Sequence, residues 1–441
     1  MSHPMPLSNP VAPAPDSECP GGAAMPPLDA WLYRQQSSGE ICMTAGVLAW
    51  FEGVPPTRRE LRELARERWS PLERLRLTPW TPGSWPRWTT GPVFDPDHHI
   101  AAPAQEELPW THGSPEPLEE RVGQLIAQPL GSPRPPWQLH LLPADGGFAL
   151  LLRAHHALLD GKSLTTLLCA LLDGQATPSG QRPRAIAAIP AQASVVPDRS
   201  SFAHALADIL PRARPLPFHG PVDPRRTVAW CRLSQDELGA ARAALPSGRA
   251  STNAVFLAAT AGALRAAGAT GRLPSLPGVC AMVPVDVRAP GEASVLGNHY
   301  ATVRVPLPGG RRPRQRLAAV DEFTRRAGMQ RRARAQARRV AATPQRYGVL
   351  THVLSRYVGS TVYSSLLCSS LATYAGPLTL GTARLTGIAG LPPLSAGRPL
   401  AVTMALHDTS AAVTVVTDQR HRELADRLPG LIRGEIHALG S

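Results

Sequence analysis

Hydrophobic residues recur with a helical period at two places in the first half of the chain. In "TRRELRELARERW", residues 57–69, the leucines fall on one side, and Thr57 and Glu60 have the spacing of a capping box. In "SLTTLLCALLDG", Ser163 is a plausible N-cap and Gly174 stands just past the expected end. Both stretches are therefore predicted to be helices.

Shorter apolar runs predict strands. "WQLHLLP" and "FALLLRA" are typical of two strands joined by the turn "ADGG". In the second half, "TVAWCRLS", "VCAMVPVDVR" and "NHYATVRVPLP" predict three further strands. "PLAVTMALH" and "AAVTVVTD" predict an antiparallel pair.

Four helices are predicted between these strands in the second half. They are "QDELGAARAAL" and "STNAVFLAATAGALRAAG", the latter opened by Ser251 or Thr252. "RQRLAAVDEFTRRAGMQRRARAQARR" predicts one long arginine-rich helix, and "RELADRLPGLIRGEIHAL" a final helix kinked or broken at its proline. Strands and helices are mixed in both halves, which indicates an α/β protein.

Proline-rich stretches suggest where the domains begin and end. Residues 1–26 are predicted to be a disordered lead, without the basic start and apolar core of a signal peptide. Residues 27–173 would form an N-terminal subdomain and residues 223–441 a C-terminal one. Residues 174–222 would be a crossover, with one helix around residues 202–210.

Composition adds size and charge to this picture. The 441 residues, 43% of them hydrophobic, suit about two domains. The net charge is +13 and Lys162 is the single lysine, so a compositional preference for arginine competes with a functional basic surface. Such a surface would suit an acidic partner or an anionic membrane. Nucleic acid is not expected, because aromatic residues make up only 5% of the chain and only Phe323 interrupts the basic run.

The six cysteines are widely scattered, without a CxxC pair or a Cys/His cluster. This excludes the usual zinc motifs and a dense disulfide framework, and it fits reduced cysteines in a cytoplasmic protein. The longest apolar runs are too short to cross a bilayer, although peripheral contact with a membrane stays open.

The strongest candidate for chemistry is "RAHHALLDGKS", Arg153 to Ser163. An imidazole at a strand end can take a proton from an attacking hydroxyl, amine or thiol at neutral pH. Successive residues leave a strand on opposite sides, so only one histidine is expected to reach a cleft. Asp160 could turn back to pair with an arginine, and Gly161 permits a close backbone approach or a positive φ.

A second histidine pair, His98–His99 in "DPDHHIAAP", has neither a predicted strand before it nor an aspartate-glycine after it. The dipeptide alone carries little information. We therefore predict a structural role for this second pair and a catalytic role for the first.

HHxxxDG resembles the signature of the coenzyme-A-dependent acyltransferase superfamily, which includes chloramphenicol acetyltransferase and the condensation domains of nonribosomal peptide synthetases. From residue 27 onward the chain resembles, more narrowly, the bacterial wax ester synthase/diacylglycerol acyltransferase family. The similar segments, in order, are "PPLDAWLY", "PLGSPRPPWQLHLL", "TNAVFLAATAGALR", "AMVPVDVR" and "LGNHYATVRVPLP".

The resemblance implies an α/β fold, an α+β sandwich of two chloramphenicol-acetyltransferase-like subdomains that meet at a central cleft and tunnel. By the family pattern, His156 is the general base, and His155, Asp160 and Gly161 complete the catalytic motif. Asp160 would form a structural ion pair with Arg288.

The resemblance also implies the reactants. The donor would be an acyl thioester on coenzyme A or on a phosphopantetheinyl carrier protein, and the acceptor an alcohol or an amine. No bound cofactor, metal or covalent acyl-enzyme is expected. Substrate contacts are assigned to Trp137, Ser163, Asn253 and Asn298, with a cap or strand-end role as the open alternative for the two asparagines.

The chain departs from the family pattern in four places. Ala254 replaces an aspartate, Gly131 follows Pro129-Leu130 where the family has the aspartate of "PLD", the late loop reads "ATYAGP" in place of "SNVPGP", and the following strand is apolar. These changes favour a specialised ester-forming acyltransferase over a producer of storage lipid. The alternatives are a condensation-type tailoring enzyme with a carrier-bound donor or an amine acceptor, and a non-catalytic binding module on the same scaffold.

Overall fold

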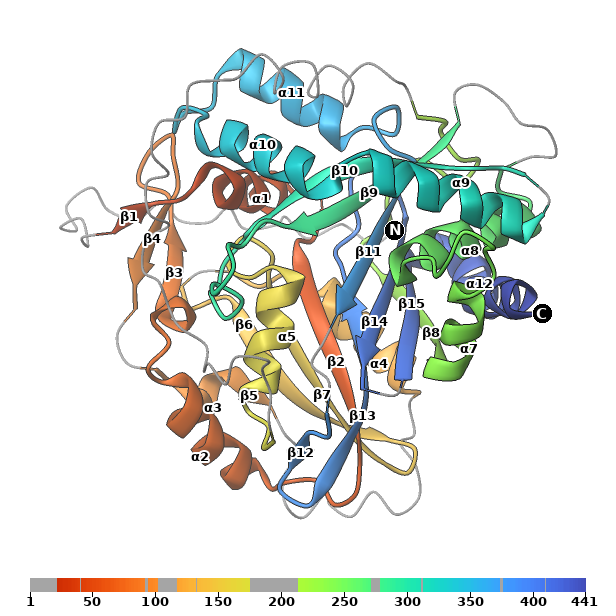
Figure 1. The fold of residues 1–441 in the computed structure, drawn as a ribbon. Coiled ribbons are helices and arrows are strands. Elements are labelled where there is room, and N and C mark those ends of the chain that lie inside the picture. The colour runs from red at the N-terminus through yellow and green to blue at the C-terminus, as the bar shows by residue number, and fades with distance from the viewer. Residues whose placement is uncertain are drawn as a thin grey trace, which may run out of the picture.

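A computed structural model gives the fold of the chain (Figure 1). It describes residues 22–39, 41–91, 94–101, 117–131, 133–174, 213–270, 278–310, 312–372, 376–408 and 410–441. The helix predicted around residues 202–210, residues 1–21 of the lead and most of the crossover lie outside these ranges.

The first large sheet has the strand order β12-β13-β2-β7-β6-β5. The predicted hairpin is confirmed, because β6 and β7 are antiparallel and joined by a tight turn. The two central strands are buried along nearly their whole length, which explains their continuous apolar sequences. The strands are β2 (Thr44–Glu52), β5 (Ile100–Ala101), β6 (Trp137–Ala144), β7 (Gly147–His155), β12 (Thr379–Leu380) and β13 (Ala383–Leu391).

The second large sheet has the order β10-β9-β11-β14-β15-β8 and contains all five strands predicted in the second half. Its sixth strand, β11, was not predicted and runs parallel to both neighbours. The strands are β8 (Arg226–Ser234), β9 (Val279–Asp286), β10 (Tyr300–Leu307), β11 (Leu366–Ala372), β14 (Leu400–His407) and β15 (Ser410–Asp418).

The two sheets do not divide the chain at one boundary. β13 pairs with β2 and therefore belongs to the sheet of the N-terminal half, although it lies within residues 223–441. Figure 1 shows β12 and β13, drawn in blue, among the red and yellow strands. β13 also packs against β14 and β15 of the other sheet, so this segment joins the two halves.

Helices cover the outer faces of the sheets (Figure 1). In the second half, α8 and α12 pack together and carry much of that half's core. The capping box of α2 forms as predicted between Thr57 and Glu60. The helices are α1 (Pro27–Ser37), α2 (Arg58–Trp69), α3 (Pro96–His99), α4 (Leu118–Ala127), α5 (Gly161–Cys169), α7 (Gln235–Arg242), α8 (Thr252–Ala266), α9 (Pro313–Arg326), α10 (Met329–Ala341), α11 (Val349–Gly359) and α12 (Arg422–Gly440), with 3-10 turns η1 (Glu73–Arg76) and η3 (Gln419–His421).

Three helix predictions need correction. The arginine-rich stretch forms two helices, α9 and α10, because Gly328 takes a left-handed φ of 56° between them. The final helix, α12, continues through Pro429 without a break. The N-cap of α5 is Asp160, whose carboxylate accepts the amide of Ser163, so Ser163 lies inside the helix and the helix ends before Gly174.

The proline-rich lead is shorter than predicted. Within residues 22–26, β1 (Ala23–Ala24) pairs with β4 (Arg87–Thr90), which in turn pairs with β3 (Leu77–Trp80). The Met25 side chain is fully buried. These residues therefore belong to the folded domain.

Candidate functional site

The HHxxxDG loop occupies the turn between the end of β7 and the start of α5. The apolar strand fixes the first histidine, and the Asp160 cap fixes where the helix begins. His155 is 1% exposed, whereas the next side chain, His156, is partly exposed. β7 ends at His155 and His156 is the first residue of the turn, so the buried ring is the one that the strand holds.

His155 is a structural residue in this geometry. Its Nδ1 accepts a hydrogen bond from the Ala157 amide at 3.0 Å, which shapes the turn. Burial, with a smaller effect of His156, lowers the pKa of His155 to about 3. A neutral, enclosed ring whose Nδ1 is already bonded cannot collect a proton from a substrate.

His156 has the opposite character. Its ring nitrogen Nδ1 is buried and has no hydrogen-bond partner among the described residues, while the side chain as a whole is partly exposed. Burial lowers the pKa of His156, and its own carbonyl group, Asp160, Asn298 and Asp29 act in the opposite direction. The ring is therefore neutral near pH 7, as a general base must be.

Asp160 of this loop and Arg288 form a buried ion pair. Arg288 Nη2 lies 3.0 Å from Asp160 Oδ2, and the two side chains are only 2% and 5% exposed. The amides of Ser163 and His299 donate to the same carboxylate at 2.7 and 2.9 Å. Burial alone raises the pKa of Asp160, but the Arg288 charge and these hydrogen bonds outweigh it and hold the pKa at about 2.

Ser163 and Gly161 complete the junction between the two halves. Ser163 Oγ accepts from Arg288 at 2.8 Å and donates to the Gly297 carbonyl at 2.9 Å, which ties α5 to the segment before β10. Gly161 has no positive φ; a Cβ there would come within 3.2 Å of the Leu371 side chain on β11. Of the two roles left open for this glycine, close approach is the one observed.

Asn298 holds two carbonyl groups of the HHxxxDG loop. Its Nδ2 donates to the carbonyls of His156 and Ala157 at 2.8 and 2.9 Å, and to Asp29 Oδ1 at 2.9 Å. The side chain is 8% exposed. The strand-end role that the sequence left open is therefore observed, and it is exerted on the backbone of the proposed base.

A second ion pair, which the sequence did not indicate, supports the loop from α1 and η1. Asp29 is 2% exposed and lies 2.8 Å from Arg74, which also donates to the Leu158 carbonyl at 2.9 Å. Asp29 further accepts from Trp88 at 3.2 Å. Asp29 stands within "PPLDAWLY", so its motif was visible, but no local pattern shows that it would meet a loop 130 residues later.

Comparisons with known proteins identify the family of the chain. A family profile described as the wax ester synthase/diacylglycerol acyltransferase catalytic domain matches residues 25–287. The chain belongs to this family. A putative diacylglycerol O-acyltransferase of Mycobacterium tuberculosis is 29% identical over 398 residues, covering 78% of this chain and 77% of the relative. A probable diacylglycerol O-acyltransferase of the same organism is 32% identical over 153 residues, and that match spans only 32% of the relative's length.

Solved structures support the same fold. The wax ester synthase/diacylglycerol acyltransferase of Marinobacter aquaeolei has a TM-score of 0.66 at 19% identity, over 95% of this chain and 98% of that one. The first condensation domain of the calcium-dependent antibiotic synthetase has a TM-score of 0.66 at 17% identity, over 95% and 96%. The two-subdomain fold expected from the family is therefore confirmed, while the tunnel remains a prediction.

Two of the residues predicted to contact substrate, Trp137 and Asn253, do not reach the HHxxxDG loop in the structure. Trp137 is fully buried, donates to the Leu75 carbonyl at 2.9 Å and stacks on His99, so it forms part of the core. Asn253 accepts from Ser370 of β11 at 3.3 Å, whereas Leu371, the next residue, faces Gly161. Because neighbouring strand residues point to opposite faces, β11 separates Asn253 from the catalytic loop.

Ser163 also needs correction as a substrate contact. It is 1% exposed, and its hydroxyl is taken up by Arg288 and by both main-chain groups of Gly297. It positions the ion pair and is closed to a ligand. Among the predicted site residues, the structure therefore brings His155, His156, Asp160, Gly161, Ser163, Arg288 and Asn298 together.

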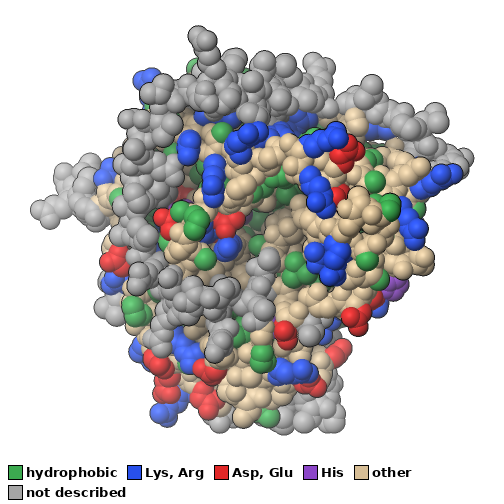
Figure 2. Space-filling view, viewed as in Figure 1, with side chains coloured by type: hydrophobic (Ala, Val, Ile, Leu, Met, Phe, Trp, Pro, Cys, Tyr) green, Lys and Arg blue, Asp and Glu red, His purple; other side chains and the backbone are tan. Residues whose placement is uncertain are grey.

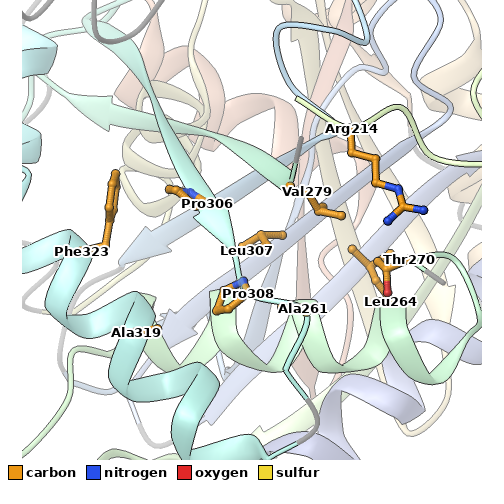
Figure 3. Close-up of a pocket in the computed structure, with 12 residues that line it drawn as sticks. Arg214, Ala261, Leu264, Thr270, Val279, Pro306, Leu307, Pro308, Ala319 and Phe323 are labelled. Carbon is orange, nitrogen blue, oxygen red and sulfur yellow. The ribbon is translucent and has the colours of Figure 1, made fainter. Parts of the chain in front are cut away.

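A separate pocket of about 290 Å³ lies at the other end of the β9–β10 hairpin (Figure 3). Its walls are mostly apolar, with Arg214 and Thr270 on one side and Phe323 on the other. It contains none of the predicted site residues. Within the described ranges, no group of His, Cys, Asp or Glu side chains could hold a metal ion, and no helix is long and apolar enough to span a membrane.

Proposed function

We propose that this protein transfers an acyl group from an acyl thioester to a hydroxyl acceptor, forming an ester, with His156 as the general base. The observation that carries the proposal is the accessibility of one neutral imidazole on a loop that one buried and one partly buried ion pair hold in place. Membership of the acyltransferase family supports the same reaction class.

The step needs no covalent acyl-enzyme. His156 Nε2 accepts the proton of the acceptor hydroxyl while the oxygen attacks the thioester carbonyl carbon. The new C–O bond forms first and gives a tetrahedral intermediate with a negative oxygen. The C–S bond then breaks, and the departing thiolate takes the proton from the imidazolium.

We also propose the chemical class of the acceptor. Relatives are named diacylglycerol O-acyltransferases, which favours a hydroxyl acceptor. The substitutions at Ala254 and in the "ATYAGP" loop fall in the second half, and they favour an acceptor other than a long-chain alcohol or a diacylglycerol. A specialised ester-forming enzyme of natural-product biosynthesis fits both observations.

A carrier-protein donor is the second candidate, and the arginines of α10 favour it. Arg331, Arg334 and Arg338 are exposed along one side of the helix, and none of them pairs with a carboxylate among the described residues. Figure 2 shows Lys and Arg side chains gathered over α9 and α10. Carrier proteins are acidic, so such a row is complementary to them at low ionic strength.

The test is thiol release by the purified chain from acyl-coenzyme A and from an acyl carrier protein, with alcohols and amines as acceptors. His156→Ala is expected to lose a factor of about 10²–10⁴ in rate. His98→Ala, which removes the exposed imidazole of the other pair, is the matched control and should keep full activity.

Equal turnover by His156→Ala and the unaltered chain would contradict the assignment of the base. Turnover only with the carrier protein, lost at raised salt, would favour the second candidate. Thioester binding without thiol release across the whole panel would favour a non-catalytic binding module.

A further inference from the structure

Tyr300 stands beside the proposed base; it lies within "LGNHYATVRVPLP", but the sequence did not single it out as a site residue. It is the first residue of β10 and pairs with Asp286 across the hairpin. Its ring centroid lies 5.6 Å from that of His156, with the two planes tilted by 42°. Tyr300 packs against the partly exposed ring of His156, and Tyr33 packs against the buried ring of His155.

The Tyr300 hydroxyl is uncommitted. It makes no hydrogen bond to any described residue, whereas the hydroxyl of Tyr347, also half-buried, donates to the Ala30 carbonyl at 2.9 Å. A largely buried phenol ordinarily finds a partner, so an open one is available to a ligand. Burial, together with Asp160 and Asp29, raises the pKa of Tyr300, so the phenol keeps its proton at neutral pH.

Several of the other donors around His156 are already used. The amides of residues 155–158 and of Asp160 all donate within the protein. Asn298 Nδ2 serves three acceptors, and the Ser163 hydroxyl serves Gly297. The tetrahedral intermediate nevertheless places a negative charge on the former carbonyl oxygen, and such a charge needs a preorganised donor.

We propose that Tyr300 is a catalytic residue whose hydroxyl donates a hydrogen bond to the thioester carbonyl oxygen as it becomes an oxyanion. This inference rests on the proposed acyl transfer. The proton of the acceptor goes to His156, the C–O bond forms, and the charge on the carbonyl oxygen is held by the Tyr300 O–H. When the C–S bond breaks, the carbonyl is restored and Tyr300 has neither gained nor lost a proton.

Tyr300→Phe removes this single donor and keeps the ring against His156. We expect kcat to fall by about 10²–10³-fold while KM changes little, because the bond strengthens as charge develops. Tyr363→Phe, at a buried tyrosine in the loop before β11, is the matched control and should keep the full rate.

A second measurement does not depend on turnover. Octanoyl-coenzyme A labelled with ¹³C at the carbonyl is bound to His156→Ala, with and without Tyr300→Phe, and its carbonyl stretch is recorded by infrared difference spectroscopy. Loss of the Tyr300 hydrogen bond should move the stretch to higher wavenumber.

The outcomes separate the two claims. An unchanged kcat in Tyr300→Phe, or an unchanged carbonyl stretch, overturns the role of Tyr300 even if His156→Ala is inactive. Full turnover in His156→Ala instead overturns the proposed function.

Discussion

The chain contains two pairs of consecutive histidines, His98–His99 and His155–His156. In each pair one imidazole is buried and the other is at least partly exposed. His99 is 4% exposed, stacks on Trp137 with ring centroids 4.2 Å apart, and bonds the Trp137 carbonyl through Nδ1 at 2.8 Å. His155 is 1% exposed and caps a turn. In this respect the two pairs are alike.

They differ around the second imidazole. His98 is an exposed side chain at the end of the short helix α3, whose other anchors are an Asp95 cap and surface ion pairs. His156 has its main-chain groups bound by Met43 and Asn298, and its loop is held by the buried Asp160–Arg288 pair and the partly buried Asp29–Arg74 pair. An accessible histidine becomes a credible base only where its backbone is held still, and the dipeptide itself carries no such information.

Breaking the ion pair should have the largest effect on this contrast. Arg288→Met leaves the Asp160 carboxylate buried without its cation, so the free energy of unfolding should fall by about 3–5 kcal/mol. Urea denaturation measures this loss, and thiol release should be lost with it. Arg225→Met, which breaks an ion pair whose arginine is 72% exposed, should cost less than about 1 kcal/mol.

The double variant Asp160→Asn with Arg288→Met sharpens this test. Because it leaves no unpaired buried charge, it should be less destabilised than the sum of the two single variants. Equal losses in Arg288→Met and Arg225→Met would show that the buried pair does not hold the loop.

Removing the buried ring of the other pair should affect stability alone. His99→Ala deletes the stack on Trp137 and should lower the free energy of unfolding by about 2–3 kcal/mol. Its kcat per folded molecule should be unchanged, because this ring is packed in the core of the first sheet. A fall in kcat at full stability would place His99 in the reaction and contradict the structural role of the pair.

The smallest expected effect is the position of the acid limb in the pH–rate profile. Burial is the largest influence on His156 and lowers its pKa below the ordinary value, and a base acts only while unprotonated. As pH falls, kcat/KM should therefore persist through about 6.5, the pKa of a free histidine, and decline only at lower pH. Denaturation curves at each pH provide the control for unfolding. An acid limb at or above the free-histidine value would show that the ring is not desolvated as described.

The sequence by itself determined the elements whose signals are local. The Thr57–Glu60 capping box, the β6–β7 hairpin and the Ser251 cap of α8 depend on residues close in sequence, and all three form. The HHxxxDG segment was likewise placed between the end of a strand and the start of a helix, although the cap of that helix is Asp160 and not Ser163. Gly328 is also a local signal, but the sequence predicted one continuous helix there because the helical pattern extends on both sides of this glycine.

Tertiary structure alone decided which residues surround the loop. Asp29 and Arg74 come from distant parts of the N-terminal half, and Asn298 and Tyr300 reach His156 only because the two halves meet. The same meeting put β13 in the N-terminal sheet and closed Ser163 to a ligand, whereas Trp137 is buried against Leu75 and His99 of its own half. The burial of a side chain and its partner in an ion pair depend on residues that are distant in sequence. A local sequence pattern therefore does not predict them.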